Sequence, residues 1–140
     1  MADVIYNAFK KNIANGNIDM DSHTIKVMLV TSAYAPNQDT HEFKSAITDE
    51  VVGAGYSPGG QELANHTVTQ DNVNNRGVFD ADDASWPGST ITARGAVIYR
   101  DTGDAGTSPL ICYIDFGVDK TSSNGELLIE WQASGILNFN

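Results

Sequence analysis

The sequence predicts an all-β fold, a jelly-roll-like antiparallel β-sandwich preceded by a short N-terminal helix. From residue 48 onward, short β-favouring runs recur at intervals of about ten residues, which is typical of sandwiches and jelly rolls. The chain contains 12 Asn, 13 Gly and 11 Thr but only 19% charged residues, and this composition favours strands joined by turns. Apolar and polar residues alternate in residues 110–116 and 127–131, as expected for strands with one buried face.

The N-terminal segment predicts the one clear helix, over residues 4–15. Four apolar residues recur there at helical spacing: Ile5, Ala8, Phe9 and Ile13. Asp3 is suited to cap the start of this helix, and Gly16 is suited to end it. With 140 residues the chain has the length of one domain. We therefore expect a single domain over residues 1–140, with a helical arm over 1–16 and the β-sandwich over 24–140.

The first strand is predicted at residues 24–30, where the sequence reads TIKVMLV. Pro36 then interrupts regular structure. Asp39 and Glu42 have the spacing of a capping box, which predicts a short helical turn over residues 41–46.

The rest of the chain is predicted to consist of strands and the turns between them. The strands are expected at residues 48–53, 63–70, 76–81, 90–100, 110–116, 126–131 and 134–139. The intervening loops are expected at residues 54–61, 71–75, 82–89, 101–109 and at Asn124-Gly125. Period-two alternation places four side chains of one strand on a common face: Leu110, Cys112, Ile114 and Phe116.

Charge and cysteine content exclude several classes of function. The net charge of −10 argues against binding a nucleic-acid backbone, which requires clustered Lys and Arg. Cys112 is the single cysteine, so we expect no internal disulfide and no cysteine-rich metal site. No segment approaches the ~20 apolar residues of a membrane span, and the N-terminus has no secretory apolar block. We therefore expect no membrane partner and folding in a cytoplasm.

The tripeptide Asp101-Thr102-Gly103 follows an apolar run, as the catalytic aspartate of a retroviral-type aspartic protease does. A dimer of such chains would supply two carboxylates that share one proton. Arg100 precedes the aspartate, however, and a neighbouring cation lowers a carboxyl pKa and opposes proton sharing. The segment after it leads directly into the next strand, which is typical of a hairpin loop. The sequence favours a turn, and the protease dimer stays as a remote alternative.

Other candidates for chemistry are weak. The acidic groups Asp80, Asp82, Asp83 and Asp19, Asp21 could bind Ca²⁺ but lack the spacing of an EF-hand loop. None of the three histidines, His23, His41 and His66, has a second histidine at metal-binding spacing. No nucleophile elbow or phosphate-binding loop is present. We expect no catalytic residue, no cofactor and no dedicated metal site, and a structural cation in the acidic loops stays open.

Aromatic residues provide the positive evidence for a contact surface. Tyr34, Tyr56 and Trp86 lie in predicted loops beside Pro and Gly, and exposed aromatic residues of this kind are common in interfaces. The alternative is that these side chains fold back and close the ends of the sandwich. Phe9 and Phe139 belong to the apolar ends of the chain, which can pack at home or dock on a neighbour. These five residues are our candidate interface residues.

The chain as a whole resembles a family of small virion structural proteins of tailed bacteriophages, and most of all a capsid decoration (cement) protein. The segments that carry the resemblance span nearly the whole sequence: TIKVMLVTSAYAPNQDTH, EVVGAGYSPGGQELAN, VFDADDASW, ARGAVIYRDTG, SPLICYIDFG and WQASGILNF. These segments are turn and core signatures, and no catalytic residues are known for such proteins.

The resemblance implies a non-enzymatic protein that is made in the cytoplasm of a bacterial host and then bound to the outside of the capsid. Its partner would be the major capsid protein, and a symmetric site on the shell favours a homo-oligomer, most simply a dimer. A position in the tail, neck or a fibre of the virion is the alternative.

Overall fold

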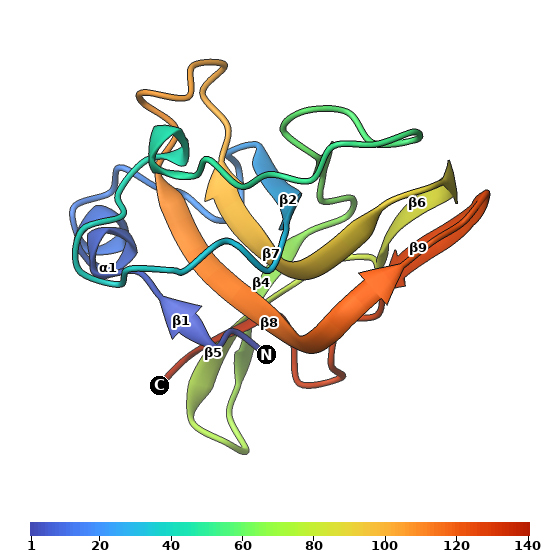
Figure 1. Ribbon diagram of the computed structural model, residues 1–140. Helices are drawn as coiled ribbons and strands as arrows, with labels where there is room; N and C mark the ends of the chain where they lie inside the picture. The colour runs from blue at the N-terminus through green and yellow to red at the C-terminus, as the bar shows by residue number, and fades with distance from the viewer.

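The computed structural model describes all 140 residues. In chain order, the elements are β1 (Val4–Ile5), α1 (Asn7–Ala14), β2 (Ile25–Val30), the 3₁₀ helix η1 (Lys44–Ala46), β3 (Gln61–Glu62), β4 (Thr67–Asp71), β5 (Arg76–Asp80), β6 (Ala84–Ser89), β7 (Thr92–Arg100), β8 (Leu110–Thr121), β9 (Gly125–Ile129) and β10 (Leu137–Phe139). Figure 1 shows the long strands β7 and β8 side by side, and both chain termini near β5.

The fold is an all-β, antiparallel sandwich with one short helix near the N-terminus, as predicted. The largest sheet has five strands in the order β1-β8-β7-β2-β3, and every pairing in it is antiparallel. Two smaller sheets, β10-β5-β4 and β6-β9, supply further strands. The β4–β5 hairpin projects from the rest of the molecule at the bottom of the view (Figure 1).

Both faces of the five-stranded sheet are buried. One face contributes to the main core of 24 buried residues, which also includes Phe79 of β5 and Leu137 of β10. The opposite face carries a second cluster of 8 buried residues, including Met28, Val97 and Tyr34 from the segment after β2. Burial on both faces explains why β2, β7 and the first half of β8 read as nearly continuous apolar runs.

A β-bulge in β8 breaks the predicted alternation of side chains. Ile98 pairs with Cys112, but the next residue, Tyr99, pairs with Leu110, so Ile111 is an extra residue on β8. As a result Ile111 and Cys112 both pack in the main core, whereas Leu110 packs in the second cluster. The prediction that Leu110 shares a face with Cys112 was wrong for this reason.

The helix begins later than predicted. Val4 and Ile5 form β1, paired with Tyr113 and Cys112 of β8, and α1 starts only at Asn7. Asp3 is not the N-cap; its Oδ2 accepts a hydrogen bond from the Asp115 backbone N–H at 2.8 Å. The predicted helix end is correct, since α1 ends before Gly16, which has a φ of 81°.

The residues of the predicted capping box have other roles. Asp39 accepts a hydrogen bond from Asn7 Nδ2 at 2.8 Å, and Glu42 forms an ion pair with Lys11 at 2.9 Å. A helical turn does follow, but as the 3₁₀ helix η1 with Phe43 at its N-cap position. Both acidic residues therefore attach the segment after β2 to the N-terminal helix.

Among the remaining assignments, the predicted strand 63–70 begins only at Thr67, as β4, and β3 takes Gln61 from the predicted loop 54–61. Two segments differ along most of their length. The segment 48–53 forms only an isolated bridge, between Glu50 and Val30. Conversely, the predicted loop 82–89 contains strand β6, which pairs with β9. The register of this pair shifts between Trp86 and Ser89, so that Pro87 lies in a bulge, where its missing N–H costs no ladder hydrogen bond.

Candidate interaction surface

Three of the five candidate interface residues are buried within this chain. The exposed fractions of Tyr34, Tyr56 and Trp86 are 7%, 8% and 4%. The ring centroids of Tyr56 and Trp86 lie 6.0 Å apart in the main core. The expectation that these aromatic side chains are exposed was therefore wrong. They fold back and pack within the sandwich, as the alternative interpretation expected.

The Tyr34 hydroxyl belongs to a buried polar chain beneath the segment after β2. It shares hydrogen bonds with the Tyr6 hydroxyl at 2.7 Å and with His41 Nδ1 at 2.9 Å. Burial raises the pKa of both tyrosines, and for Tyr6 the hydrogen bond to Tyr34 adds to the effect. These contacts attach the segment to the outer face of the large sheet, and so they stabilise the fold.

The Tyr56 hydroxyl is also held in hydrogen bonds that stabilise the fold. It donates a hydrogen bond to Glu50 Oε2 at 2.6 Å and accepts one from the buried Leu29 N–H at 2.9 Å. The same Glu50 oxygen accepts the Gly59 N–H at 2.7 Å. Burial first and the hydrogen bond to Glu50 second raise the pKa of Tyr56. Tyr56 thus joins the loop 54–61 to the edge of β2.

Phe9 and Phe139 lie together at the end of the sandwich where both termini meet. Phe9 is 2% exposed and belongs to the main core, so α1 is not a free arm. Phe139 is half-buried, packs against the same core, and has its ring centroid 6.1 Å from that of Phe9. Of the five candidates, only Phe139 is therefore positioned to meet a partner without rearrangement.

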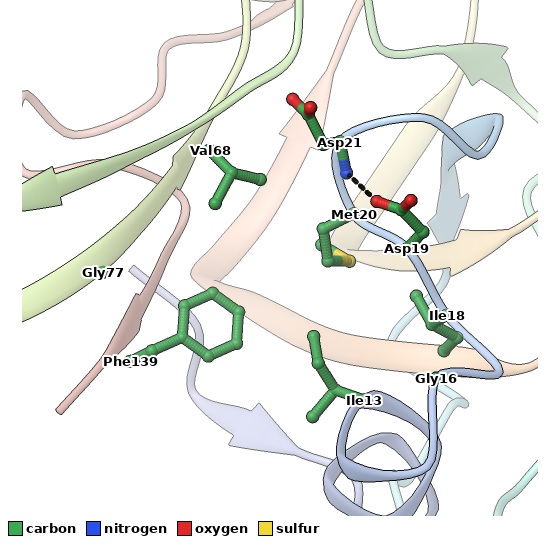
Figure 2. A pocket seen from close by; sticks show the side chains of 9 residues that line it. All are labelled: Ile13, Gly16, Ile18, Asp19, Met20, Asp21, Val68, Gly77 and Phe139. Atoms are coloured by element: carbon green, nitrogen blue, oxygen red, sulfur yellow. Dashed lines mark hydrogen bonds between the residues drawn. The ribbon is translucent and has the colours of Figure 1, made fainter.

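The ring of Phe139 borders the largest open apolar concavity of the molecule, which we call the Phe139 groove. It has a volume of about 520 Å³. Figure 2 shows its walls: the end of α1 and the following linker on one side, and the sheet β10-β5-β4 on the other. The lining residues are Ile13, Gly16, Ile18, Asp19, Met20, Asp21, Val68, Gly77 and Phe139.

The groove exists because the helix and linker cover the small sheet incompletely. Strand register places Val68 opposite Phe79, and Gly77 opposite Phe139, so these side chains share the inner face of the sheet. Phe79 is fully buried there, whereas Val68 remains 43% exposed. A Cβ atom on Gly77 would only come within 3.5 Å of Phe139, so the missing side chain keeps the floor of the groove open.

The rim of the groove on the linker side is acidic. Asp19 accepts hydrogen bonds from the Ser22 hydroxyl at 2.7 Å and from the backbone N–H groups of Asp21 and Ser22. These bonds, the Ser22 hydroxyl first, lower the pKa of Asp19, so its negative charge persists in mildly acidic solution. The arrangement is an apolar floor beside fixed anionic charge, and the two rim aspartates are the only titratable side chains among the lining residues.

Asp101 lies in the loop that connects β7 and β8, consistent with the predicted turn. It accepts the Gly103 N–H at 2.9 Å and forms an ion pair with Lys26 at 3.1 Å. The Gly103 hydrogen bond first, and then Lys26, lower the pKa of Asp101. A carboxyl group held in its anionic form is poorly suited to share a proton with a second aspartate.

The other acidic candidates are engaged in the chain's own polar contacts. Asp82 accepts a hydrogen bond from Asn65, Asp83 accepts the Trp131 N–H, and Asp80 accepts the N–H of its neighbour Ala81. No three His, Cys, Asp or Glu side chains lie where they could hold a metal ion together. No helix of the chain could cross a membrane.

Sequence reasoning missed the Phe139 groove, because its walls come from three separate stretches of the chain. The signal that could have found it is the helical stripe that ends in Ile13, followed by Ile18 and Met20 in a turn-rich linker. Comparison with family models, with curated proteins and with solved structures found no match for this chain.

Proposed function

We propose that this protein is a non-enzymatic structural component of a tailed-phage virion, a decoration protein that binds the outer capsid surface where capsomers meet and stabilises the shell. The observation that carries the proposal is the character of the open surface. The largest concavity is an apolar groove whose only titratable side chains are the rim carboxylates Asp19 and Asp21, which suits contact with another protein. The resemblance of the sequence to decoration proteins supports the same conclusion.

The rest of the molecule has the features of a rigid domain, as reinforcement of a shell would require. Both faces of the large sheet are buried, and 29 backbone hydrogen bonds outside regular helices and strands restrain the loops. A rigid domain loses little conformational entropy on binding, so more of the free energy of contact remains as affinity. Many weakly bound copies would together resist the outward pressure of packaged DNA.

The occupant of the Phe139 groove in this proposal is an apolar segment of the major capsid protein with a Lys or Arg beside it. The apolar part would contact Val68, Met20 and Phe139, which line the groove. The basic side chain would meet the acidic rim at Asp19 and Asp21. A protein with a net charge of −10 also favours a basic partner surface, so binding should weaken as salt concentration rises.

The test uses capsid shells of the phage that encodes this chain, purified without it. Addition of the wild-type protein should raise the temperature at which the shells break, and the protein should sediment with them. Val68→Asp should abolish both effects, because it places a charge on the groove floor. Val118→Asp is the matched control, because Val118 is 65% exposed on β8 and does not line the groove.

Two outcomes would refute the proposal. Shells that break at the same temperature with and without bound protein would exclude a stabilising role. Labelled protein found only at the tail, neck or a fibre of intact particles would replace the capsid assignment by the alternative one.

A further inference from the structure

The outer edge of β4 has no partner in the chain. β4 is the last strand of the order β10-β5-β4, and its one pairing is with β5. Its first four residues are exposed, and no backbone hydrogen bond joins Thr67–Asp71 to any other element. A row of free N–H and C=O groups of this kind is a template for another strand.

β4 differs from the other open edges in having no feature that blocks pairing. Natural proteins protect edges by charge, proline, bulges or short length. Charged residues protect two of the other edges: Glu126 and Glu130 at β9, and Asp119 and Lys120 at the open end of β8. A proline, Pro87, protects β6. β1, β3 and β10 are two or three residues long. The sequence Thr67-Val68-Thr69-Gln70 has no charge, no proline and no bulge.

The one charged residue of β4 is already neutralised. Asp71 forms an ion pair with Arg76 at 3.0 Å and accepts the backbone N–H groups of Val73 and Asn74. The hairpin end therefore presents a compensated charge rather than a bare carboxylate. Two copies of a chain with net charge −10 repel each other. Because the charge of Asp71 is compensated, the strand β4 itself adds little to this repulsion when two of its edges meet.

We propose that two copies of this chain pair through their β4 edges, antiparallel and about a twofold axis at Thr69. In this register Thr69 faces its own copy, Thr67 faces Asp71 of the second copy, and Val68 faces Gln70 of the second copy. The pairing joins two three-stranded sheets into one of six strands. An isologous contact of this kind closes on itself and gives a dimer rather than a fibre.

The pairing uses the backbone edge of β4, and the side chain at its axis, Thr69, lies on the face opposite to the groove. Thr67, Thr69 and Asp71 alternate with Val68 and Gln70, and Val68 lies on the inner face with Phe79. Pairing in the plane of the sheet consumes backbone groups of the β4 edge and places Gln70 of the second copy beside Val68, at the border of the Phe139 groove. The proposal is independent of the capsid role, because it concerns the purified protein alone.

Sedimentation velocity over a micromolar concentration series is the test. Wild type should be dimeric at the higher concentrations, and its dissociation constant should decrease as salt screens the repulsion between acidic chains. Thr69→Glu and Thr69→Lys should each weaken the dimer by about tenfold, because like charges then face each other at the axis. A mixture of the two variants should restore dimers, now as heterodimers.

Val118→Glu, which adds the same charge to an exposed position on β8, should leave the dissociation constant unchanged. A wild-type protein that stays monomeric at every concentration and salt condition would overturn the proposal. So would a dimer that tolerates both Thr69 variants, because its interface must then lie elsewhere.

Discussion

The polar network around Tyr56 can be tested by removing a single oxygen atom. In Tyr56→Phe the buried Leu29 N–H loses its acceptor, and an unsatisfied buried donor costs about 1–3 kcal/mol. Glu50 loses one donor but keeps the Gly59 N–H at 2.7 Å, and the lost hydrogen bond to a half-buried carboxylate adds about 1 kcal/mol. We expect the free energy of unfolding to fall by about 3 kcal/mol.

Urea denaturation followed by tryptophan fluorescence measures this change. With a slope of about 2 kcal/mol/M, the midpoint should fall by about 1.5 M while the slope stays constant. Tyr113→Phe is the matched control, because Tyr113 is 5% exposed but its hydroxyl makes no hydrogen bond with the protein. A loss below about 0.5 kcal/mol in Tyr56→Phe would show that the hydroxyl of this residue does not hold the loop to β2.

Three further predictions concern stability and reactivity. Gly95→Ala should lower the free energy of unfolding, measured by urea denaturation, by about 2 kcal/mol, because the new Cβ would lie 2.7 Å from a backbone oxygen. Gly77→Ala should stay within about 1 kcal/mol of wild type. Equal effects of the two variants would contradict the packing argument. Burial raises the pKa of Cys112 to about 12, so a thiol reagent should react only as fast as the protein unfolds, and rapid labelling of the native state would refute this. The same shift should make the free energy of unfolding fall as pH rises from about 9 toward 12, because the thiol ionises in the unfolded chain while the buried thiol stays protonated. The pKa of Asp101 is lowered by the Gly103 N–H and by Lys26, so its carboxylate stabilises the fold above about pH 4 and loses this contribution as pH falls. The difference in urea midpoint between wild type and Asp101→Asn should therefore shrink in acid. A difference that stays constant with pH would contradict this role of Asp101.

Strands whose signals are local were predicted well. β2 begins one residue after the start of the predicted segment 24–30, and β5 occupies five of the six residues predicted at 76–81. In both, β-branched and aromatic residues stand between turn residues, and the same residues fill the core. The turn at Asn124 was also predicted, and its φ of 46° is a conformation that asparagine tolerates.

Elements that depend on distant partners were predicted badly. Trp86-Pro87-Gly88 has the composition of a loop, yet pairing with β9 and burial of Trp86 make it part of a strand. Val4 and Ile5 lie in the segment 4–15 that was predicted to be helical, but they pair with the edge of β8 as a strand. In each case the deciding contact lies more than 30 residues away in sequence, where periodicity carries no information.

The candidate site shows the same limit for side chains. A tyrosine between Gly and Ser in a loop gives no sign that its hydroxyl is bonded to the backbone of β2, and so Tyr56 was expected on the surface. Phe139 was chosen because it ends an apolar segment, and its half-exposed position follows from how far α1 and the linker reach across the small sheet. The depth of that cover depends on packing between elements and is not encoded in any one segment.

Both proposals place function on the β4–β5 hairpin, and neighbouring residues of β4 can separate them. Val68 points to the inner face and lines the Phe139 groove, whereas Thr69 points to the outer face at the proposed twofold axis. A charge at position 68 should therefore impair binding to shells and weaken the dimer less than a charge at position 69 does, because the two copies of residue 68 lie diagonally rather than directly opposite each other. A charge at position 69 should weaken the dimer and leave the binding of a single groove to the shell unchanged. If capsid binding requires the dimer, through two grooves engaged at once, the position 69 variants should lose affinity for shells in proportion to their loss of dimer, and the mixture of Glu and Lys variants should recover both together.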